Sequence, residues 1–361
     1  MIYTDKSIKE AAMNEHKRSF LTDLIIYLTL IVLIIAQTSC EGAVKGVSSE
    51  SADSSFFAMD TYITVKAYGE NAKTGAGKAR EKITALEKLW SVTDTNSEIY
   101  AANHNGTAKL SPETAEIVRF TLEMCKATDG ALDISLYPVL TAWGFTAGEH
   151  HVPTDEELSE LLHNVGYDRI TLDGSTLTVP GGMQIDLGAI GKGYAGDLAA
   201  RELRESGVTS ALIDLGGNIQ TIGAKPDGSA WKVGIRSPFD SGSFATLSVT
   251  DKAVVTSGGY ERYFEQDGEI YWHILDPKTG KPVHSGLLSV TVIGDEGRLC
   301  DAFSTSLFVM GIGGAERLWR EQNDFDFIAL TDGGEIFITA GIEDSFELNA
   351  NYTGLNVSVI R

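Results

Sequence analysis

Cysteine is scarce in this sequence, with three residues among 361, at positions 40, 125 and 300. Three widely spaced cysteines provide neither a disulfide framework nor a zinc site. Cys125 and Cys300 lie in apolar segments of helical character, so we expect both to be small core residues. Proline is also rare, with eight residues, whereas the 38 glycines suit tight turns and close approach of the backbone to a ligand.

Positive charge is in deficit. The 29 Lys and Arg residues face 50 Asp and Glu residues, which gives a formal net charge of −21 and a pI of about 4.7. A surface of this sign repels nucleic acid, so a nucleic-acid-binding role is excluded. A small anionic ligand would need a local cation, either a metal ion or a well-placed Lys or Arg.

Long hydrophobic runs are missing too. The apolar segment 24–36, "LIIYLTLIVLIIA", has 13 residues and is short for a membrane span, which needs about 20. It follows Lys17 and Arg18 and has the length of the core of an export signal. The segment leads into "QTSC", which ends at Cys40 and resembles a bacterial lipoprotein box, with Gln37 in place of the usual aliphatic residue.

We therefore expect residues 1–39 to be an export signal, with Met13 as an alternative start, and Cys40 to be lipidated. The domain would then be extracytoplasmic, anchored to the outer face of the cell membrane. An uncleaved anchor and ordinary secretion are the alternatives, and both also place the domain outside the cytoplasm. Residues 40–55 are small and polar and predict a flexible tether, so the folded domain, 56–361, is expected to begin near Phe56.

Alternating and helical patterns follow one another along the domain. Helices are predicted at 75–90, at 112–130 with Ser111 as the cap, at 155–166, at 299–311 and at 313–322, with a loop over 95–107 and a hairpin around Asp173-Gly174. Strands are predicted at 56–69, at 184–187 before a helix that ends at Gly207, and at 210–224, 231–238, 253–264 and 288–294. Residues 271–283 are predicted to form a strand and then a turn, and further strands are predicted after residue 322. Runs of strands with interspersed helices predict an α+β fold: a single large mixed domain with mostly antiparallel sheets and flanking helices.

The segment 186–197, "DLGAIGKGYAGD", is a glycine-rich turn between a predicted strand and a helix. Gly188, Gly191 and Gly193 flank Lys192, and a turn of this kind exposes backbone groups to a phosphate. The lysine supplies the local positive charge that the acidic surface lacks. The pattern is neither a P-loop nor a Rossmann fingerprint, and by itself a plain turn with an exposed lysine explains it equally well.

The segment 299–311, "LCDAFSTSLFVMG", places an acid inside an apolar helix. Asp301 lies one turn before Thr305 on the same face, and a carboxylate among apolar groups is costly unless it is paired or coordinated. A carboxylate with a hydroxyl suits Mg²⁺. The structural alternative is a buried Asp that caps a loop, with Thr305 bonded back to a helical carbonyl. His273, before a "DP" turn, is a candidate general base or a turn cap.

Eight segments, in their order along the chain, resemble the ApbE family of FAD:protein FMN transferases. They span about Phe57 to Gly311 and are "AMDTYITV", "SEIYAANHNG", "GALDISLYPVLTAWGF", "IDLGAIGKGYAGD", "LIDLGGN", "TSGGYERYF", "HILDPKTGKP" and "CDAFSTSLFVMG". Single segments are weak signals, whereas eight in this order are specific.

The resemblance implies a T-fold-like domain that binds FAD and a divalent metal ion, usually Mg²⁺. It implies transfer of the FMN half of FAD onto a Thr or Ser hydroxyl of a target protein, through a phosphoester, with release of AMP. The implied metal ligands are Ala189, through its carbonyl, Asp301 and Thr305. The implied FAD contacts are Met59, Glu98, Ile99, Tyr100, Asp133, Lys192 and Leu275. The implied catalytic residues are His273, Asp301 and Lys192.

The chemistry of these residues fits this implication. A metal between the two phosphates and the Lys192 ammonium would offset charge on the phosphoryl oxygens, and His273 would take the proton of the acceptor hydroxyl. Export suggests a membrane-associated redox subunit as the acceptor. Two alternatives stay open: an FAD pyrophosphatase that releases FMN and AMP, and a flavin-binding lipoprotein without catalysis.

Overall fold

The computed structural model describes residues 50–146 and 148–361. The described residues all belong to one compact unit. The predicted export signal, the lipidation residue Cys40 and most of the predicted tether lie outside them. No helix in the described ranges combines the length and apolar character that a membrane span requires.

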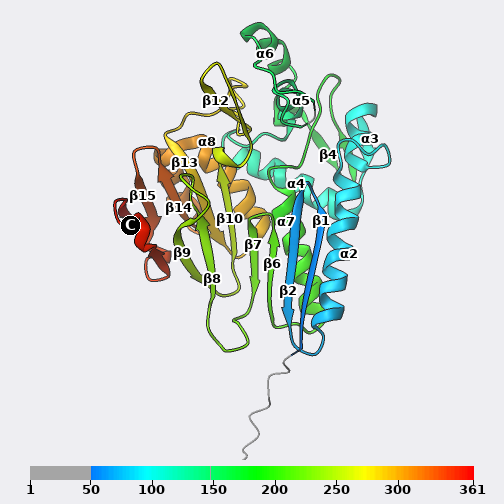
Figure 1. The fold of residues 1–361 in the computed structure, drawn as a ribbon. Coiled ribbons are helices and arrows are strands. Elements are labelled where there is room, and N and C mark those ends of the chain that lie inside the picture. The colour runs from blue at the N-terminus through cyan, green and yellow to red at the C-terminus, as the bar shows by residue number, and fades with distance from the viewer. Residues whose placement is uncertain (1–49, 147) are drawn as a thin grey trace, which may run out of the picture. The chain divides into compact units, whose positions relative to one another are not determined.

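A nine-stranded sheet is the centre of the fold (Figure 1). Its pairs are antiparallel apart from β15 and β17, which run parallel. In spatial order the strands are β1 (Ser51–Ala58), β2 (Thr61–Tyr68), β6 (Ser210–Leu215), β7 (Asn218–Ile222), β10 (Ala253–Gly258), β13 (Leu287–Gly294), β14 (Asp326–Thr331), β15 (Glu335–Thr339) and β17 (Asn356–Ile360).

Three small antiparallel sheets and seven helices complete the described residues. The small sheets are β16 (Phe346–Leu348), β9 (Ser243–Val249) and β8 (Trp231–Arg236); β3 (Thr107–Lys109), β5 (Thr176–Thr178) and β4 (Thr171–Asp173); and β11 (Tyr263–Gln266) with β12 (Glu269–Trp272). The helices are α2 (Ala72–Trp90), α3 (Glu98–Asn105), α4 (Pro112–Ala127), α5 (Tyr137–Ala142), α6 (Asp155–Leu162), α7 (Gly191–Glu205) and α8 (Gly297–Gln322). Short 3₁₀ turns lie at Ile134–Leu136, Tyr167–Arg169, Gly259–Glu261, Ala340–Ile342 and Ala350–Tyr352.

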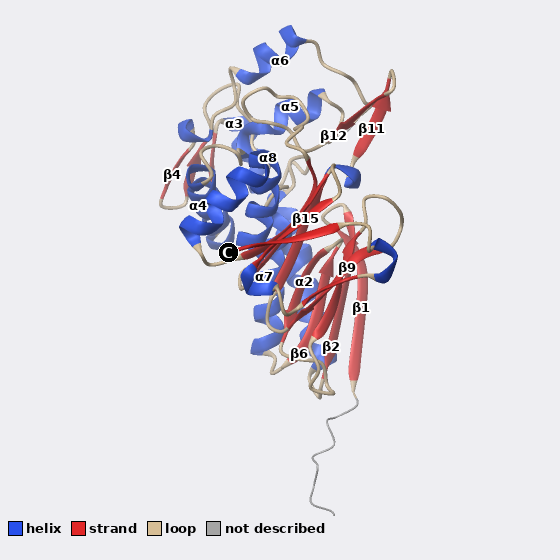
Figure 2. Cartoon of the chain, turned by 90° about the vertical axis from the view of Figure 1, so that its left-hand side faces the viewer, coloured by secondary structure: helices blue, strands red, loops and turns tan. Residues whose placement is uncertain are grey.

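The two faces of the large sheet are covered differently. Helices α2, α7 and α8 lie on one face (Figure 2), where α7 packs against both α2 and α8. The sheet β16-β9-β8 packs on the other face, and its Phe244 and Leu247 share a hydrophobic cluster with Ile328 of β14 and Ile338 of β15. This arrangement confirms the predicted α+β domain with mostly antiparallel sheets and flanking helices. Cys125 and Cys300 are fully buried, which confirms them as core residues.

Helix α8 is interrupted at the boundary that the sequence predicted. Gly311 has φ 69° and ψ 176°, outside the helical region, so two helical segments meet there. A left-handed φ costs glycine little, because glycine has no Cβ. The interruption ends the segment that carries Asp301 and Thr305 and turns the chain toward the second segment.

The N-terminal strands differ from the prediction. Residues 56–69 were expected to form one strand, but they form part of a hairpin that turns at Met59 and Asp60, whose φ values are 52° and 56°. Strand β1 begins at Ser51, within the stretch expected to be tether. The start of β1 was not predicted because its first residues are small and polar. Ser51 and Asp53 are exposed, and the segment is a strand because it pairs with β2.

Residues 184–187 were also wrongly predicted, as a strand. Their backbone groups bond to other partners. The Asn103 side chain donates to the Ile185 carbonyl and accepts the Ile185 N–H, both at 2.8 Å, and the Asp186 N–H donates to the Ile134 carbonyl at 3.0 Å. A side-chain amide therefore takes the place of a neighbouring strand.

Two further elements were missed. The predicted loop 95–107 contains α3, whose cap Ser97 accepts the Tyr100 N–H at 2.9 Å and whose end is set by Gly106 at φ 73°. Strand β9 was not predicted from its mixed sequence. It is a strand because it pairs with β8 on one side and β16 on the other.

Candidate active site

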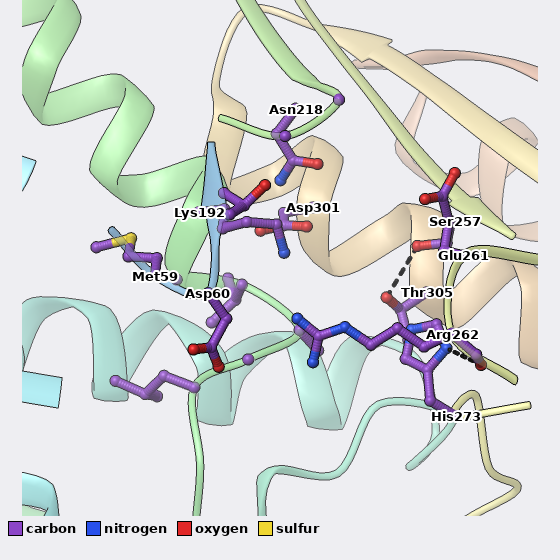
Figure 3. A pocket seen from close by; sticks show the side chains of 18 of the residues that line it. Met59, Asp60, Lys192, Asn218, Ser257, Glu261, Arg262, His273, Asp301 and Thr305 are labelled. Atoms are coloured by element: carbon purple, nitrogen blue, oxygen red, sulfur yellow. Dashed lines mark hydrogen bonds between the residues drawn. The ribbon is translucent and has the colours of Figure 1, made fainter. Parts of the chain in front are cut away.

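A cavity of about 1330 Å³ lies where the ends of several elements meet (Figure 3). The β1–β2 turn, the segment before α7, the end of β10, the chain after β12 and the first turns of α8 all contribute to its lining. Eight of the residues that the sequence assigned to the site line it: Met59, Asp133, Ala189, Lys192, His273, Leu275, Asp301 and Thr305. Segments as distant as the first strand and the last long helix are therefore brought to one place.

The floor of the cavity, defined here as residues 191–197 of α7 and 297–305 of α8, is a close junction of two helices. A Cβ on Gly193 would clash with the Gly297 carbonyl and lie 2.7 Å from Asp301 Cβ. The Gly193 N–H donates to Asp301 Oδ2 at 2.8 Å. Glycine is required here because the two backbones approach directly, and the same approach fixes the Asp301 side chain.

Asp197 joins the two helices a second time. Its carboxylate accepts the N–H groups of Gly297 at 2.6 Å and Arg298 at 2.9 Å, the first residues of α8. The Gln220 side chain donates to the same carboxylate at 2.8 Å. Burial raises the pKa of Asp197, although these three hydrogen bonds oppose the rise. A residue of α7 thus caps α8 and satisfies backbone donors that would otherwise lack partners.

Asp301 and Thr305 have the character of hard-metal ligands. Asp301 is 4% exposed, and no ion pair to it is found within residues 50–146 and 148–361. Its one hydrogen bond, from Gly193, does not neutralise a buried carboxylate, so a cation fits beside it. Thr305 Oγ1 lies 3.1 Å from Ser257 Oγ, which lies 2.8 Å from Ser304 Oγ. The oxygen-only donor set suits Mg²⁺.

The small number of charged ligands beside Asp301 is compatible with Mg²⁺. The described residues contain no group of three or more His, Cys, Asp or Glu side chains that could hold a metal ion. A site with one carboxylate and one hydroxyl from the chain suits Mg²⁺, which keeps several waters and is also bound by substrate phosphates. The residues present therefore fit a metal ion that arrives with a phosphate ligand.

His273 follows β12 directly and is half-buried. Its Nδ1–H donates to the Arg262 carbonyl at 3.2 Å, because a carbonyl only accepts, and this leaves Nε2 with a free lone pair. The pKa of His273 is lowered to about 4, mainly by burial and in smaller part by the nearby charges of Arg262 and Lys192, while the hydrogen bond to the Arg262 carbonyl opposes the fall. The ring is neutral at pH 7 and can accept a proton at Nε2.

The sequence did not identify several charged residues that line the cavity, and two of them lie beside predicted site residues. Arg262 lines the cavity next to His273, and Asp186 lines it next to Lys192. Burial raises the pKa of Asp186, while the Gly188 N–H, bonded at 2.7 Å, and the two cations oppose that rise. Arg262 lies in "YERYF" and Asp186 lies in "IDLG", two segments that resemble the family. That position in the sequence could have identified both residues as candidates for the site.

The cavity combines charges of both signs. Its lining includes five cations, Lys88, Lys192, Lys232, Arg236 and Arg262, and eight carboxylates, Asp60, Glu87, Asp94, Asp133, Asp186, Asp214, Glu261 and Asp301. Lys192 and Arg262 lie close enough to His273 for their charges to lower its pKa. These two cations supply local positive charge for an anionic ligand in spite of the net charge of −21.

The segment 98–100 lies away from the cavity lining. Glu98 accepts the Ser111 N–H at 2.8 Å and therefore supports the start of α4, whereas Ile99 is fully buried in the core. Tyr100 stacks on His104 with ring centroids 3.7 Å apart. The assignment of Glu98, Ile99 and Tyr100 as FAD contacts stays a prediction, and the side-chain contacts give it no support.

Asp133 lines the cavity but uses its carboxylate locally. Oδ1 accepts the Ser135 N–H at 2.8 Å and its hydroxyl at 2.6 Å, and Oδ2 accepts the Tyr167 N–H at 3.0 Å. The carboxylate therefore shapes the loop between α4 and α5. A contact of Asp133 with FAD stays a prediction.

The roof of the cavity, defined here as α5, α6 and the hairpin β11–β12, is held by a separate hydrophobic cluster. Trp143 packs against Tyr271 with ring centroids 5.4 Å apart, and its Nε1–H donates to the Gly280 carbonyl at 2.7 Å. Phe264 packs against Tyr271 at 5.2 Å. The chain beside this cluster contributes Leu140, Phe145 and Leu275 to the cavity lining, among other residues. The roof thus offers apolar surface for a planar ring, opposite a polar floor.

Comparison with known proteins agrees with this geometry. Residues 59–329 match the sequence profile of the ApbE family. An FAD:protein FMN transferase of Klebsiella pneumoniae (strain 342) is 34% identical over 292 residues, 78% of this chain and 90% of the relative. One of Haemophilus influenzae is 29% identical over 337 residues, 88% of this chain and 95% of the relative.

Solved structures show the same fold. The ApbE protein of Thermotoga maritima superposes with a TM-score of 0.77 at 30% identity, over 82% of this chain and 99% of that one. The flavinyl transferase ApbE of Pseudomonas stutzeri, in its apo form, superposes with a TM-score of 0.74 at 27% identity, over 83% and 98%. From its sequence, its fold and the residues that line its cavity, this chain belongs to the ApbE family.

Proposed function

We propose that the protein is a Mg²⁺-dependent FAD:protein FMN transferase, which moves FMN from FAD onto a Thr or Ser hydroxyl of an extracytoplasmic protein. Its relatives are named for FMN transfer from FAD to protein. The observation that carries the proposal is that one cavity combines two surfaces. Its floor presents Lys192 and the buried Asp301 carboxylate, which suit a diphosphate with a metal ion, and its roof is apolar, which suits a flavin ring.

The reaction exchanges a phosphoanhydride bond for a phosphoester bond. The acceptor hydroxyl oxygen forms a bond to the phosphorus of the FMN half, the bond from that phosphorus to the AMP phosphate oxygen breaks, and AMP leaves with the bonding electron pair. The hydroxyl proton passes to His273 Nε2, which is free because Nδ1 bonds to the Arg262 carbonyl. Lys192 lies at the start of α7, where its ammonium faces charge that develops on the phosphoryl oxygens.

Asp301, Thr305 and the Ala189 carbonyl would hold Mg²⁺ on the floor. The ion would supply Lewis-acid stabilisation to the phosphate oxygens when bound. Ser257 supports this role by bonding to the Thr305 hydroxyl, and Gly193 supports it by fixing one Asp301 oxygen. The chain therefore orients two oxygens toward the cavity before any ligand is present.

The binding of FAD would itself adjust His273. Arg262 and Lys192 depress the pKa of the ring in the free protein. A diphosphate between these cations offsets their charge, so its arrival moves the pKa of His273 back toward its ordinary value. A base whose pKa approaches the working pH takes up a proton more effectively. Binding of FAD would therefore make His273 a stronger base.

The cellular setting follows from residues outside the described ranges. We propose that Cys40 is lipidated and that the domain is anchored to the outer face of the cell membrane, where it modifies a subunit of a membrane redox complex. The basic and apolar pattern of 17–36 and the following "QTSC" support this proposal. A lipid anchor would keep the enzyme close to acceptors that share the membrane.

The test is co-expression with candidate acceptors, meaning exported proteins with flavin domains, followed by mass spectrometry of the acceptor. We expect the added mass of FMN, less one water, on a single Thr or Ser. Asp301→Asn should lose transfer by at least about a hundredfold, since Asn keeps an oxygen acceptor for Gly193 but carries no charge for the metal. Full transfer by Asp301→Asn after chelator treatment would contradict the metal assignment.

Incubation with FAD and Mg²⁺ without an acceptor separates the other functions. Rapid release of AMP under these conditions would identify a pyrophosphatase, because water then replaces the hydroxyl. Tight FAD binding with no AMP in either experiment would identify a carrier. The transferase is expected to release AMP at the rate at which the acceptor gains FMN.

A further inference from the structure

The first residue of β7, Asn218, has a side chain without a partner. Asn218 is 5% exposed and lines the cavity. Its Nδ2 atom is buried and has no hydrogen-bond partner in the described part of the chain. Figure 3 shows its amide pointing toward Lys192 and Asp301. A buried amide donor without an acceptor costs about 1–3 kcal/mol, so its presence here needs a reason.

Gln220, two residues further along the same strand, shows what such an amide does when the chain provides an acceptor. Both residues are 5% exposed, and both point to the same face of the sheet because side chains alternate along a strand. Gln220 Nε2 donates to the Asp197 carboxylate at 2.8 Å. The amide of Asn218 has no such acceptor within hydrogen-bond distance in the described residues, and its side chain borders the cavity instead. The acceptor of Asn218 is therefore expected to come from a ligand.

The position of Asn218 is set by its turn. Gly216 and Gly217 have φ values of 64° and 97°, which suit a tight hairpin turn between β6 and β7, and the Gly217 N–H donates to Asp214 at 2.8 Å. A Cβ on Gly216 would lie 2.8 Å from Thr61 Cβ. The turn therefore packs tightly against Thr61 at the start of β2, and Thr61 also lines the cavity. Asn218 is held in place and cannot easily turn away to find another partner.

We propose that Asn218 binds the substrate by donating a hydrogen bond to an oxygen of the FAD diphosphate; this inference rests on the proposed function. The neighbouring Lys192 and the candidate metal ligand Asp301 both indicate that phosphate oxygens lie at this depth of the cavity. A neutral amide adds a directed hydrogen bond where a further cation would compete with the metal. Asn218 therefore helps to distinguish a diphosphate from a free flavin.

The test compares three ligands by isothermal titration calorimetry in a chelator-containing buffer, where no turnover is expected. For Asn218→Ala, we expect the Kd of FAD and of ADP to rise at least about tenfold, because each loses one hydrogen bond to a charged group. Riboflavin has no phosphate, so its Kd should stay within about twofold. Asn218→Asp should weaken FAD and ADP further, because it adds a negative charge beside the phosphates.

Thermal unfolding of the free protein gives the second readout. Asn218→Ala should not lower Tm, because it removes a donor that has no partner in the folded chain. Gln220→Ala is the matched control and should lower Tm, because it removes a donor from the buried Asp197 carboxylate. A fall in Tm for Asn218→Ala equal to that of Gln220→Ala would assign Asn218 a structural role.

The outcomes separate this inference from the proposed function. Unchanged affinity of Asn218→Ala for FAD and ADP, or an equal loss for riboflavin, would overturn the inference while the proposed function stands. Failure of the unmodified protein to bind FAD would overturn both.

Discussion

The floor and the roof of the cavity are held together in opposite ways. In the floor, backbone meets backbone at Gly193 and Gly297, and the buried carboxylates of Asp197 and Asp301 bond to main-chain N–H groups. In the roof, aromatic side chains such as Trp143 and Phe264 pack in a cluster apart from the main core. Hydrogen bonds to backbone fix atoms, whereas aromatic packing adapts to small shifts. The protein places its candidate chemistry on the first and its apolar contacts on the second.

The largest expected effect comes from adding one carbon atom to the floor. Gly193→Ala should leave little folded protein, because the new Cβ would clash with Gly297 and crowd Asp301. Overpacking of this kind costs about 3 kcal/mol or more where backbone cannot move. Thermal unfolding measures the loss. The control is Gly77→Ala in α2, where a Cβ meets no atom within 4 Å; it should stabilise the protein by about 0.5–1 kcal/mol. Equal Tm values for the two variants would mean that the floor is not tight.

A large truncation in the roof should act more locally. Trp143→Ala removes the ring that contacts Tyr271 and the donor to the Gly280 carbonyl, at a cost of about 3–5 kcal/mol. Because the cluster is separate from the main core, hydrogen exchange should accelerate in α5 and in β11–β12 but not in β6 and β13. Affinity for riboflavin should fall with it. Faster exchange throughout the large sheet would show that roof and floor fold as one unit.

Asp197→Asn tests the joint between α7 and α8 without changing its shape. The amide NH₂ group would face one of the backbone donors that the carboxylate now satisfies, so we expect a loss of about 2 kcal/mol by chemical denaturation. Asp227→Asn, in an exposed turn, is the control and should change stability little. If both substitutions have the same small effect, Asp197 does not hold the two helices together.

The smallest effect concerns the boundary between the two regions, where His273 lies. Its pKa of about 4 in the free protein is lowered first by burial and then by Arg262 and Lys192. Arg262→Gln keeps the carbonyl that accepts the Nδ1–H and removes one positive charge. The pKa should therefore rise but stay below 6.5, because the burial remains. NMR titration of the ring measures this, with Arg320→Gln as a distant control, and an unchanged pKa would contradict the electrostatic argument.

The same pKa sets a pH dependence of stability. Between pH 6.5 and pH 4 the unfolded chain binds a proton at His273 and the folded chain does not, so the unfolded state is favoured progressively as the pH falls. The stability that the neutral ring preserves is complete above pH 6.5 and is lost as the pH falls toward 4. His273→Asn should flatten part of this dependence.

The sequence predicted the parts of the site that have a strong local pattern. The acid in the apolar stripe pointed to Asp301, the glycine-rich turn pointed to Lys192, and the position before the "DP" turn pointed to His273. The pieces that were missed depend on contacts between distant segments. The extended segment at Ile185 bonds to the Asn103 side chain, 82 residues earlier, and no local pattern shows this. The unpaired amide of Asn218 becomes visible only when the surrounding atoms are known.

The hydrogen bond from Gly193 to Asp301 joins residues 108 positions apart, and this distance has a consequence for timing. Contacts between distant residues form slowly, because the entropy cost of closing a long loop comes before the stabilisation that the contact provides. A chain that has not yet folded its last helix against α7 holds no carboxylate at the glycine-rich turn and cannot bring Asp301 to Lys192. We expect a chain that is still being synthesised to leave FAD intact, so activity would begin only when the fold is complete.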